Sequence, residues 1–120
     1  MKLENQVCSL ELAKKLKELG GKQESLFYWH LDGDDEWELV MEKDVFPQVL
    51  DFCYPAFTVA ELGEMLPEEI HTFKLSDEFC CESNQPDYFP KGKSNLFFTA
   101  DTEANARAKM LIYLLENKLI

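Results

Sequence analysis

The chain has 120 residues, of which 46% are hydrophobic and 29% are charged, a composition typical of a globular domain rather than a disordered or fibrous chain. Its 23 acidic and 12 basic residues give a net charge of −11 at pH 7. The field of such a molecule repels nucleic acid, so we do not expect it to bind a duplex by neutralising phosphates. A chain of this length buries enough surface to fold without a metal or a disulfide, and we expect one domain over residues 1–120.

Residues 1–6 lack the apolar stretch of a secretory signal, and no run reaches the roughly 18 apolar residues of a membrane span. The cysteines show neither a disulfide framework nor a C-x-x-C zinc spacing; they are Cys8, Cys53, Cys80 and Cys81. We therefore expect reduced thiols, a cytoplasmic location and no membrane contact. These patterns give no reason to expect a cofactor or a metal site.

The acidic residues are concentrated in the middle of the chain. Residues 31–82 contain fifteen acids and two bases, a net charge of −13, whereas residues 1–30 and 83–120 each carry +1. Two interpretations of this acidic segment stay open: a set of solvated loops, or a surface offered to a basic partner. The densest cluster supplies the candidate partner-binding residues, which are Asp32, Asp34, Asp35, Glu36, Trp37 and Glu38.

The first predicted element is a helix over residues 10–19. Ser9 is a suitable N-cap, and three leucines recur at i, i+4 and i+7, the spacing of one helical face. Gly20 then suits the left-handed conformation in which many helices end.

Two aromatic, β-prone stretches follow over residues 26–31 and 36–41, and the Asp32-Gly33 turn between them predicts a β-hairpin. Alternation puts Phe27, Trp29 and Leu31 on one face of the first strand and Leu26, Tyr28 and His30 on the other. If one row faces the helices, the other needs a cover from the middle helix, from residues 42–56 or from a partner subunit. The aromatic side chains of the hairpin are either the core of its sheet or the anchors of an interface.

Residues 42–56 show no regular period and are interrupted by Pro47 and Pro55. We expect a long connection that pins aromatic side chains onto the core. A short helical turn over residues 47–52 is an alternative for part of it.

The middle helix has the clearest local signal in the chain. Thr58 and Glu61 form a capping box, and Phe57 and Leu62 form the matching hydrophobic staple. The helix is predicted to end at Leu66, ahead of a proline.

Further strands and a last helix follow. Residues 71–75 alternate as a strand, residues 78–82 either extend it or form a second short strand, and residues 95–100 form another. The last helix is predicted over about residues 102–117, with Asp101 as its cap. Its apolar stripe consists of Ala104, Ala108, Leu111 and Leu115, widened by Ile112 and Leu119.

The predicted order is α-β-β-α-β-β-α. It indicates an α+β fold, a single layered domain with an antiparallel sheet of about four strands packed by helices. The terminal helices would cover one face of this sheet. The middle helix would either join them or lie on the opposite face.

Four segments carry a resemblance: SLELAKKLKELG at 9–20, QESLFYW at 23–29, AFTVAELGEMLP at 56–67 and TADTEANARAKMLIYLLENKLI at 99–120. Together they resemble a group of small uncharacterised proteins encoded in bacteriophages and prophages, over about half of the chain. One departure is Gly21, where the resemblance leads us to expect an apolar residue. The resemblance implies a phage origin and an intracellular setting in an infected bacterium, and it transfers no catalytic residue.

The sequence contains no nucleotide-binding, metalloprotease or serine-hydrolase motif. The two histidines, His30 and His71, fit half-buried strand positions as well as a general base or a metal ligand. The acidic turn lacks the spacing of a calcium loop, because Gly33 comes too early and Lys43 occupies the twelfth position from Asp32.

Carboxylates and thiols outside this turn give no clear catalytic pattern. Glu61, Glu64, Glu68 and Glu69 are candidates for paired catalytic carboxylates, but the first is engaged in the capping box and the last two follow a proline in an exposed turn. A nucleophile at Cys80 or Cys81 needs a nearby base that the sequence does not supply, so buried thiols are the simpler interpretation. We expect no catalytic residue.

Three classes of function remain, of which we expect the first and keep the other two as alternatives. The first is a non-catalytic phage accessory protein that binds another protein in the host cytoplasm, as a monomer or a homodimer. The second is an inhibitor of a host defence nuclease, of the anti-CRISPR or anti-restriction type, whose acidic surface imitates nucleic-acid phosphates and binds a basic host protein. The third is a small enzyme or nucleotide-binding protein with an unrecognised site.

Overall fold

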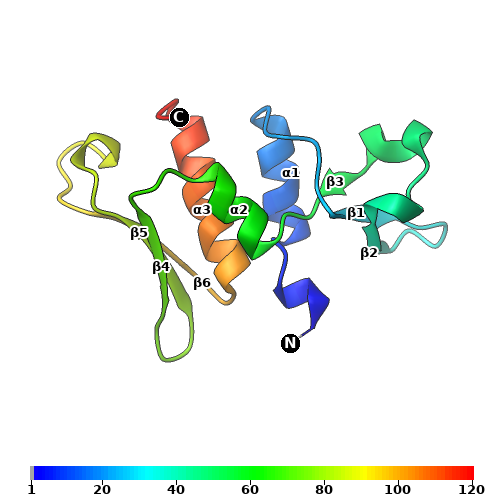
Figure 1. Cartoon of the computed structure of the whole chain (residues 1–120), viewed down its shortest axis with the longest axis horizontal. Coiled ribbons are helices and arrows are strands. Elements are labelled where there is room, and N and C mark those ends of the chain that lie inside the picture. The colour runs from blue at the N-terminus through cyan, green and yellow to red at the C-terminus, as the bar shows by residue number, and fades with distance from the viewer. Residues whose placement is uncertain (1) are drawn as a thin grey trace.

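The computed structural model describes residues 2–120, apart from the side chains of Gln48, Leu50 and Asp51. Within this part of the chain, three α-helices form a central layer, and a three-stranded antiparallel sheet lies at each end of it (Figure 1). The helices are α1 (Leu10–Glu18), α2 (Val59–Met65) and α3 (Glu103–Glu116). Because the sheets flank the helices, the molecule is elongated, with extents of 47 × 32 × 22 Å.

The two sheets have the strand orders β2-β1-β3 and β4-β5-β6. Their strands are β1 (Phe27–Leu31), β2 (Trp37–Met41), β3 (Tyr54–Pro55), β4 (Ile70–Lys74), β5 (Phe79–Ser83) and β6 (Leu96–Ala100). The predicted α+β class is confirmed, but the single sheet of about four strands is wrong. Residues 78–82 belong to a separate strand at the centre of the second sheet, and β3 adds a third strand to the hairpin. The helix layer lies between the two strand groups, which therefore cannot pair with each other.

The end of α1 explains the unexpected glycine at position 21. Gly20 has a φ of +76°, as predicted, and its N–H donates to the Lys17 carbonyl. The N–H of Gly21 donates to the Leu16 carbonyl at 3.0 Å, which completes a Schellman motif. A Cβ at position 21 would lie 2.9 Å from the same carbonyl oxygen, so an apolar side chain does not fit.

The predicted start and end of α2 are confirmed. Thr58 Oγ1 accepts a hydrogen bond from the Glu61 N–H at 3.1 Å, and Glu61 Oε1 accepts one from the Thr58 N–H at 3.0 Å. The C-cap is Leu66. Glu61 Oε1 also accepts a hydrogen bond from Ser25 Oγ at 2.8 Å, so the capping box connects α2 to the segment that enters β1.

The last helix, α3, occupies the centre of the molecule and is buried on several sides. Its seven buried residues include Ala106 and Met110, which lie outside the predicted stripe. The helix contacts α1, α2 and all three strands of the second sheet. The prediction that both terminal helices cover one face of a common sheet is therefore wrong, because α1 packs against β3 of the first sheet.

The N-cap of α3 is Thr102, not Asp101 as predicted. Thr102 Oγ1 accepts a hydrogen bond from the Asn105 N–H at 3.1 Å, whereas Asp101 Oδ1 accepts one from Asn105 Nδ2 at 3.1 Å. Asn105 Oδ1 in turn accepts a hydrogen bond from the Ser9 N–H at 2.8 Å. Thr102 lies three positions before Asn105, the spacing at which an N-cap side chain reaches a backbone amide of the first turn. Asp101 instead orients the Asn105 side chain, which joins the starts of α3 and α1.

Residues 42–52 form two short 3-10 helices, Glu42–Asp44 and Pro47–Phe52, and the second matches the predicted turn. This segment covers the face of the hairpin that carries His30, so the cover comes from the connection and not from the middle helix. The expectation that the connection pins its aromatic side chains onto the core is wrong for Phe46 and Phe52. They are 72% and 76% exposed.

The main core lies between the three helices and the second sheet. Side chains of the first sheet reach it only at its margin, through the partly buried Trp29 and Tyr54. Trp29 Nε1 donates a hydrogen bond to the Cys8 carbonyl at 3.0 Å. The first sheet is thus an extension attached to the core at few points. Among residues 2–120, no helix combines the length and apolarity needed to cross a bilayer.

Candidate functional site

The first sheet, its hairpin turn and the 3-10 helices form a lobe that we call the acidic wing, residues 26–55 (Figure 1). The acidic wing contains eight acids and one lysine, a net charge of −7. Residues 70–100, which include the second sheet, contain four acids and three lysines, a net charge of −1. The acidic middle of the sequence is therefore not one surface, because the structure gathers eight of its fifteen acids at one end of the molecule.

The β1–β2 turn at the tip of the wing is organised by Asp32. Its Oδ1 accepts hydrogen bonds from the N–H groups of Asp34 at 2.7 Å and Glu36 at 3.1 Å. The left-handed residue of the turn is Asp35, with a φ of +63°, and not Gly33. One carboxylate therefore holds the backbone of the turn, while Asp34, Asp35 and Glu36 are exposed.

Trp37 contacts the body of the molecule. Its ring centroid lies 5.6 Å from that of Tyr54, and Lys14 Nζ lies 5.1 Å from the Trp37 ring centroid. Lys17 Nζ lies 5.1 Å from the Tyr54 ring centroid and donates a hydrogen bond to the Cys53 carbonyl at 3.0 Å. These cation–π contacts attach the wing to α1, so the ring of Trp37 is engaged within the chain.

A pocket of about 180 Å³ opens between the hairpin and the 42–52 segment. Its walls include His30 and Glu38, which are cross-strand partners in β1 and β2, and Asp44 from the first 3-10 helix. The Nδ1 atom of His30 is buried and makes no hydrogen bond among the described residues. It lies 3.9 Å from Glu38 Oε1, beyond hydrogen-bonding distance, so an unsatisfied polar atom lies in the wall of the pocket beside the Glu38 carboxylate.

Large apolar side chains are exposed on the same wing. Phe46 and Phe52 are mostly in solvent, and Leu26, Leu31 and Met41 are also exposed. Exposed phenylalanines give no stability to the folded chain and are typical anchors of protein interfaces when polar residues surround them.

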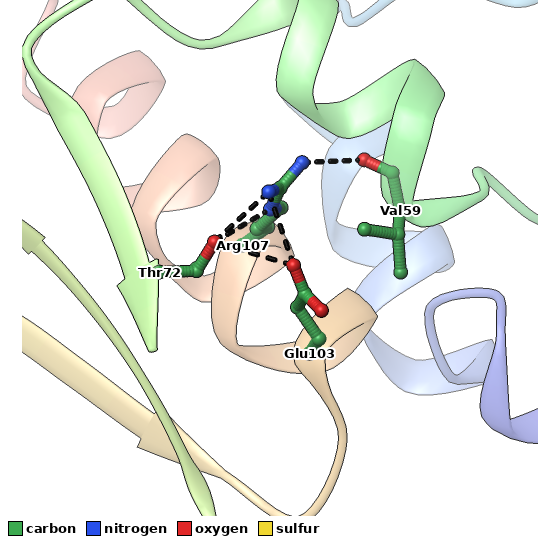
Figure 2. A network of polar contacts seen from close by, with 4 residues as sticks. All are labelled: Val59, Thr72, Glu103 and Arg107. Atoms are coloured by element: carbon green, nitrogen blue, oxygen red, sulfur yellow. Dashed lines mark hydrogen bonds and ion pairs between the residues drawn. The ribbon is translucent and has the colours of Figure 1, made fainter. Parts of the chain in front are cut away.

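A second polar cluster centres on Arg107 of α3 (Figure 2). Its guanidinium donates to the Val59 carbonyl at 2.9 Å and to Thr72 Oγ1 at 2.9 Å, and it pairs with Glu103 at 3.0 Å. The side chain of Arg107 is only 22% exposed. Val59 begins α2 and Thr72 lies in β4, whereas Glu103 lies one turn earlier in α3. The cluster therefore links α3 to the start of α2 and to β4.

We assign a structural role to the Arg107 cluster because its charged groups satisfy one another. A neighbouring pocket of about 310 Å³ is also lined by Glu64 and Glu68, which adds negative charge beside the guanidinium. A Cβ on Gly63 would overlap Nη1 of Arg107, so the glycine provides the space for this side chain. The signal in the sequence was a single arginine within the alanine-rich, buried part of the last helix.

Thiol and metal chemistry find little support in the structure. Burial raises the pKa of Cys8 and that of Cys81 to about 12, and it also raises the pKa values of Cys53 and Cys80. All four cysteines are free and buried, whereas the sequence predicts burial for Cys80 and Cys81 alone. No group of three His, Cys, Asp or Glu side chains in the described part of the chain could hold a metal ion.

The other candidate residues are not brought together. His71 is the second residue of β4, whereas His30 belongs to β1, and these strands lie at opposite ends of the molecule. Glu61 is held by the capping box. Asp44, Phe46 and Phe52 were not predictable as site residues, because residues 42–56 lack a regular period. Comparison of the chain with protein-family models, curated proteins and solved structures found no match.

Proposed function

We propose that this protein acts without catalysis, by binding another protein through the acidic wing. The observation that carries the proposal is the pairing of the mostly exposed Phe46 and Phe52 with a local net charge of −7. Such a surface complements a partner that presents basic side chains around an apolar patch. Charge then steers the encounter, and burial of the two rings supplies affinity.

The resemblance to phage and prophage proteins supplies the setting of the proposal. The binding partner is then a protein in the cytoplasm of an infected bacterium, and a small accessory protein is suited to altering that partner's activity. The proposal needs no cofactor and no membrane contact. Either a monomer or a homodimer can present the acidic wing, because the wing lies at one end of the elongated chain.

Affinity capture from infected host cells tests the proposal when it compares matched variants. The double variant Phe46→Ser/Phe52→Ser removes both exposed rings from the wing, and Phe73→Ser/Phe97→Ser removes two exposed rings from the second sheet. We expect the first variant to lose the partner and the second to retain it. Loss with the second variant and retention with the first would place the interface on the second sheet and overturn the proposal.

A second candidate function is inhibition of a host defence nuclease by imitation of nucleic acid. The exposed Asp34, Asp35 and Glu36 at the tip of the wing favour it, because they present adjacent carboxylates without basic neighbours in the turn. This candidate predicts a basic partner that is lost at high salt and on charge reversal at the tip. It also predicts that Phe46→Ser/Phe52→Ser binds almost normally, which distinguishes it from the first proposal.

A small enzyme or nucleotide-binding protein is the third candidate. Its support is the pocket that joins His30 to Glu38 and Asp44, since a histidine beside carboxylates suits acid–base chemistry. The pocket volume of about 180 Å³ is below the roughly 300–1,000 Å³ of typical small-molecule sites. We therefore place this candidate below the two binding functions.

A further inference from the structure

We infer that the pocket in the acidic wing receives one basic side chain, a lysine or an arginine, of the protein that the wing binds. This inference rests on the proposed function, because the side chain belongs to that partner. A cation from the partner would then be the central contact of the interface, and the exposed phenylalanines alone do not define the charge of that contact.

The size and walls of the pocket fit a single long side chain. Its volume is about 180 Å³, and Val40, Val45, Val49 and Phe46 supply apolar surface around it. Lysine and arginine have aliphatic stems that pack against apolar surface while the charged end reaches polar groups. The valine and phenylalanine walls of the pocket thus suit the aliphatic stem of a lysine or an arginine.

The polar groups of the pocket favour a donor that carries positive charge. Glu38 and Asp44 are carboxylates, which accept hydrogen bonds and donate none when ionised. The buried Nδ1 atom of His30 lies beside Glu38 without a hydrogen-bond partner among the described residues. An ammonium or guanidinium group donates several hydrogen bonds and accepts none, so it complements the two carboxylates. An anionic side chain would meet two like charges.

The surroundings of the pocket suit a contact at the centre of an interface. Phe46 lines the pocket and also extends into solvent with 72% of its surface exposed. A partner that covers this ring would exclude water from the adjacent pocket and strengthen the charge contact inside it. The basic side chain and the ring would therefore act together.

Nuclear magnetic resonance with three small probes tests the inference on the full chain. The probes are N-acetyl-lysine methylamide, N-acetyl-arginine methylamide and N-acetyl-norleucine methylamide, the last of which has an aliphatic stem without a cation. We expect the two cationic probes to shift the Val40, Val45 and Val49 methyl signals and the His30 ring signals in a saturable way. An equal response to the norleucine probe, or no response to any probe, would overturn the inference.

A matched pair of variants tests the role of charge. Glu38→Gln/Asp44→Asn removes two charges from the pocket, and Asp77→Asn/Glu78→Gln removes two charges from the β4–β5 turn. We expect the first variant to weaken binding of the cationic probes about tenfold and the second to leave it unchanged, because only nearby charges escape screening. Equal weakening in both variants would mean that the probes respond to net charge, and the inference would fail.

The partner experiment separates this inference from the proposed function. If Phe46→Ser/Phe52→Ser abolishes capture while Glu38→Gln/Asp44→Asn leaves it intact, the wing is the interface but the pocket is not its basic-residue site. If the pocket variant weakens capture and the phenylalanine variant does not, the pocket inference stands and the ring-centred proposal fails. We expect both variants to fold, because all four substituted residues are exposed, and thermal unfolding of each variant checks this.

Discussion

A substitution at Gly63 tests the packing of α2 against α3. Gly→Ala in a helix normally raises the unfolding free energy, and here we expect it to lower that free energy. A Cβ at this position would overlap Nη1 of Arg107, the atom that donates to the Val59 carbonyl. Gly63→Ala must therefore move the end of the arginine side chain. The backbone of α2 does not obstruct the methyl group, so the cost falls on the hydrogen bonds of Arg107.

Two opposing terms set the size of the effect. In a helix interior, replacing glycine by alanine stabilises a protein by about 0.5–1 kcal/mol. Loss of a hydrogen bond from a charged donor costs about 1.5–3 kcal/mol, and we take the lower end because Arg107 is 22% exposed and regains some hydration. We therefore expect Gly63→Ala to destabilise the fold by about 0.5–1 kcal/mol, opposite to the effect of helix propensity.

Urea unfolding followed by circular dichroism measures this effect in two backgrounds. With Arg107→Ala already present, Gly63→Ala should stabilise the chain by about 0.5–1 kcal/mol, a coupling of about 1.5 kcal/mol between the two sites. Gly33→Ala is the control, because a Cβ there meets nothing within 4 Å. Equal effects of Gly63→Ala in both backgrounds would refute the placement of the guanidinium against α2.

Three further predictions concern stability. Arg107→Ala should lower the unfolding free energy by about 2–3 kcal/mol and the Tm by roughly 8–12 °C, because it removes the ion pair with Glu103 and the hydrogen bond to the Val59 carbonyl and leaves Glu103 with the bond from the Thr72 hydroxyl; calorimetry measures both. Asp35→Gly should raise the unfolding free energy by about 0.5 kcal/mol in urea titrations, because Asp35 has a φ of +63°, and no gain would contradict that backbone conformation. Stability should fall between pH 9 and 12: burial raises the pKa of Cys8 and Cys81 from 9.0 to about 12, so the unfolded chain loses protons that the folded chain keeps. Urea unfolding at several pH values should show a smaller slope for Cys81→Ala, and an unchanged slope would contradict the assignment.

Features of the fold that depend on residues close together in the sequence were predictable. The capping box of Thr58 and Glu61 and the glycine that ends α1 use contacts within a few positions of the chain. The strands of the second sheet were predicted near residues 71–75, 78–82 and 95–100, but their separation from the hairpin was not, because it depends on the helix layer that lies between the two sheets. The burial of both Cys80 and Cys81 in β5 also breaks the alternation of a strand with one buried face. The two-residue β3 includes Pro55, a residue that strands disfavour, so its pairing with β1 depends on the tertiary structure.

The pocket was not predictable because it depends on the register of the hairpin. A symmetric pairing of the predicted strands, 26–31 and 36–41, would place His30 opposite Trp37. The turn from Asp32 to Glu36 shifts the register by one residue, so His30 pairs with Glu38. A shift of one residue changes the face on which each side chain lies, and this shift brings a carboxylate beside the imidazole.

The position of the acidic wing lets the chain carry a strongly charged surface at little cost to folding. Carboxylates that crowd a core would destabilise it by mutual repulsion, but the core lies between the helices and the second sheet. At the base of the wing, Lys14 and Lys17 of α1 place positive charge on the rings of Trp37 and Tyr54. The exposed acids of the turn lie farther out and hold no part of the core. Removal of the charges of Asp34 and Glu36 should therefore leave stability unchanged, so under the proposed function a loss of partner binding in such variants can be attributed to the interface itself.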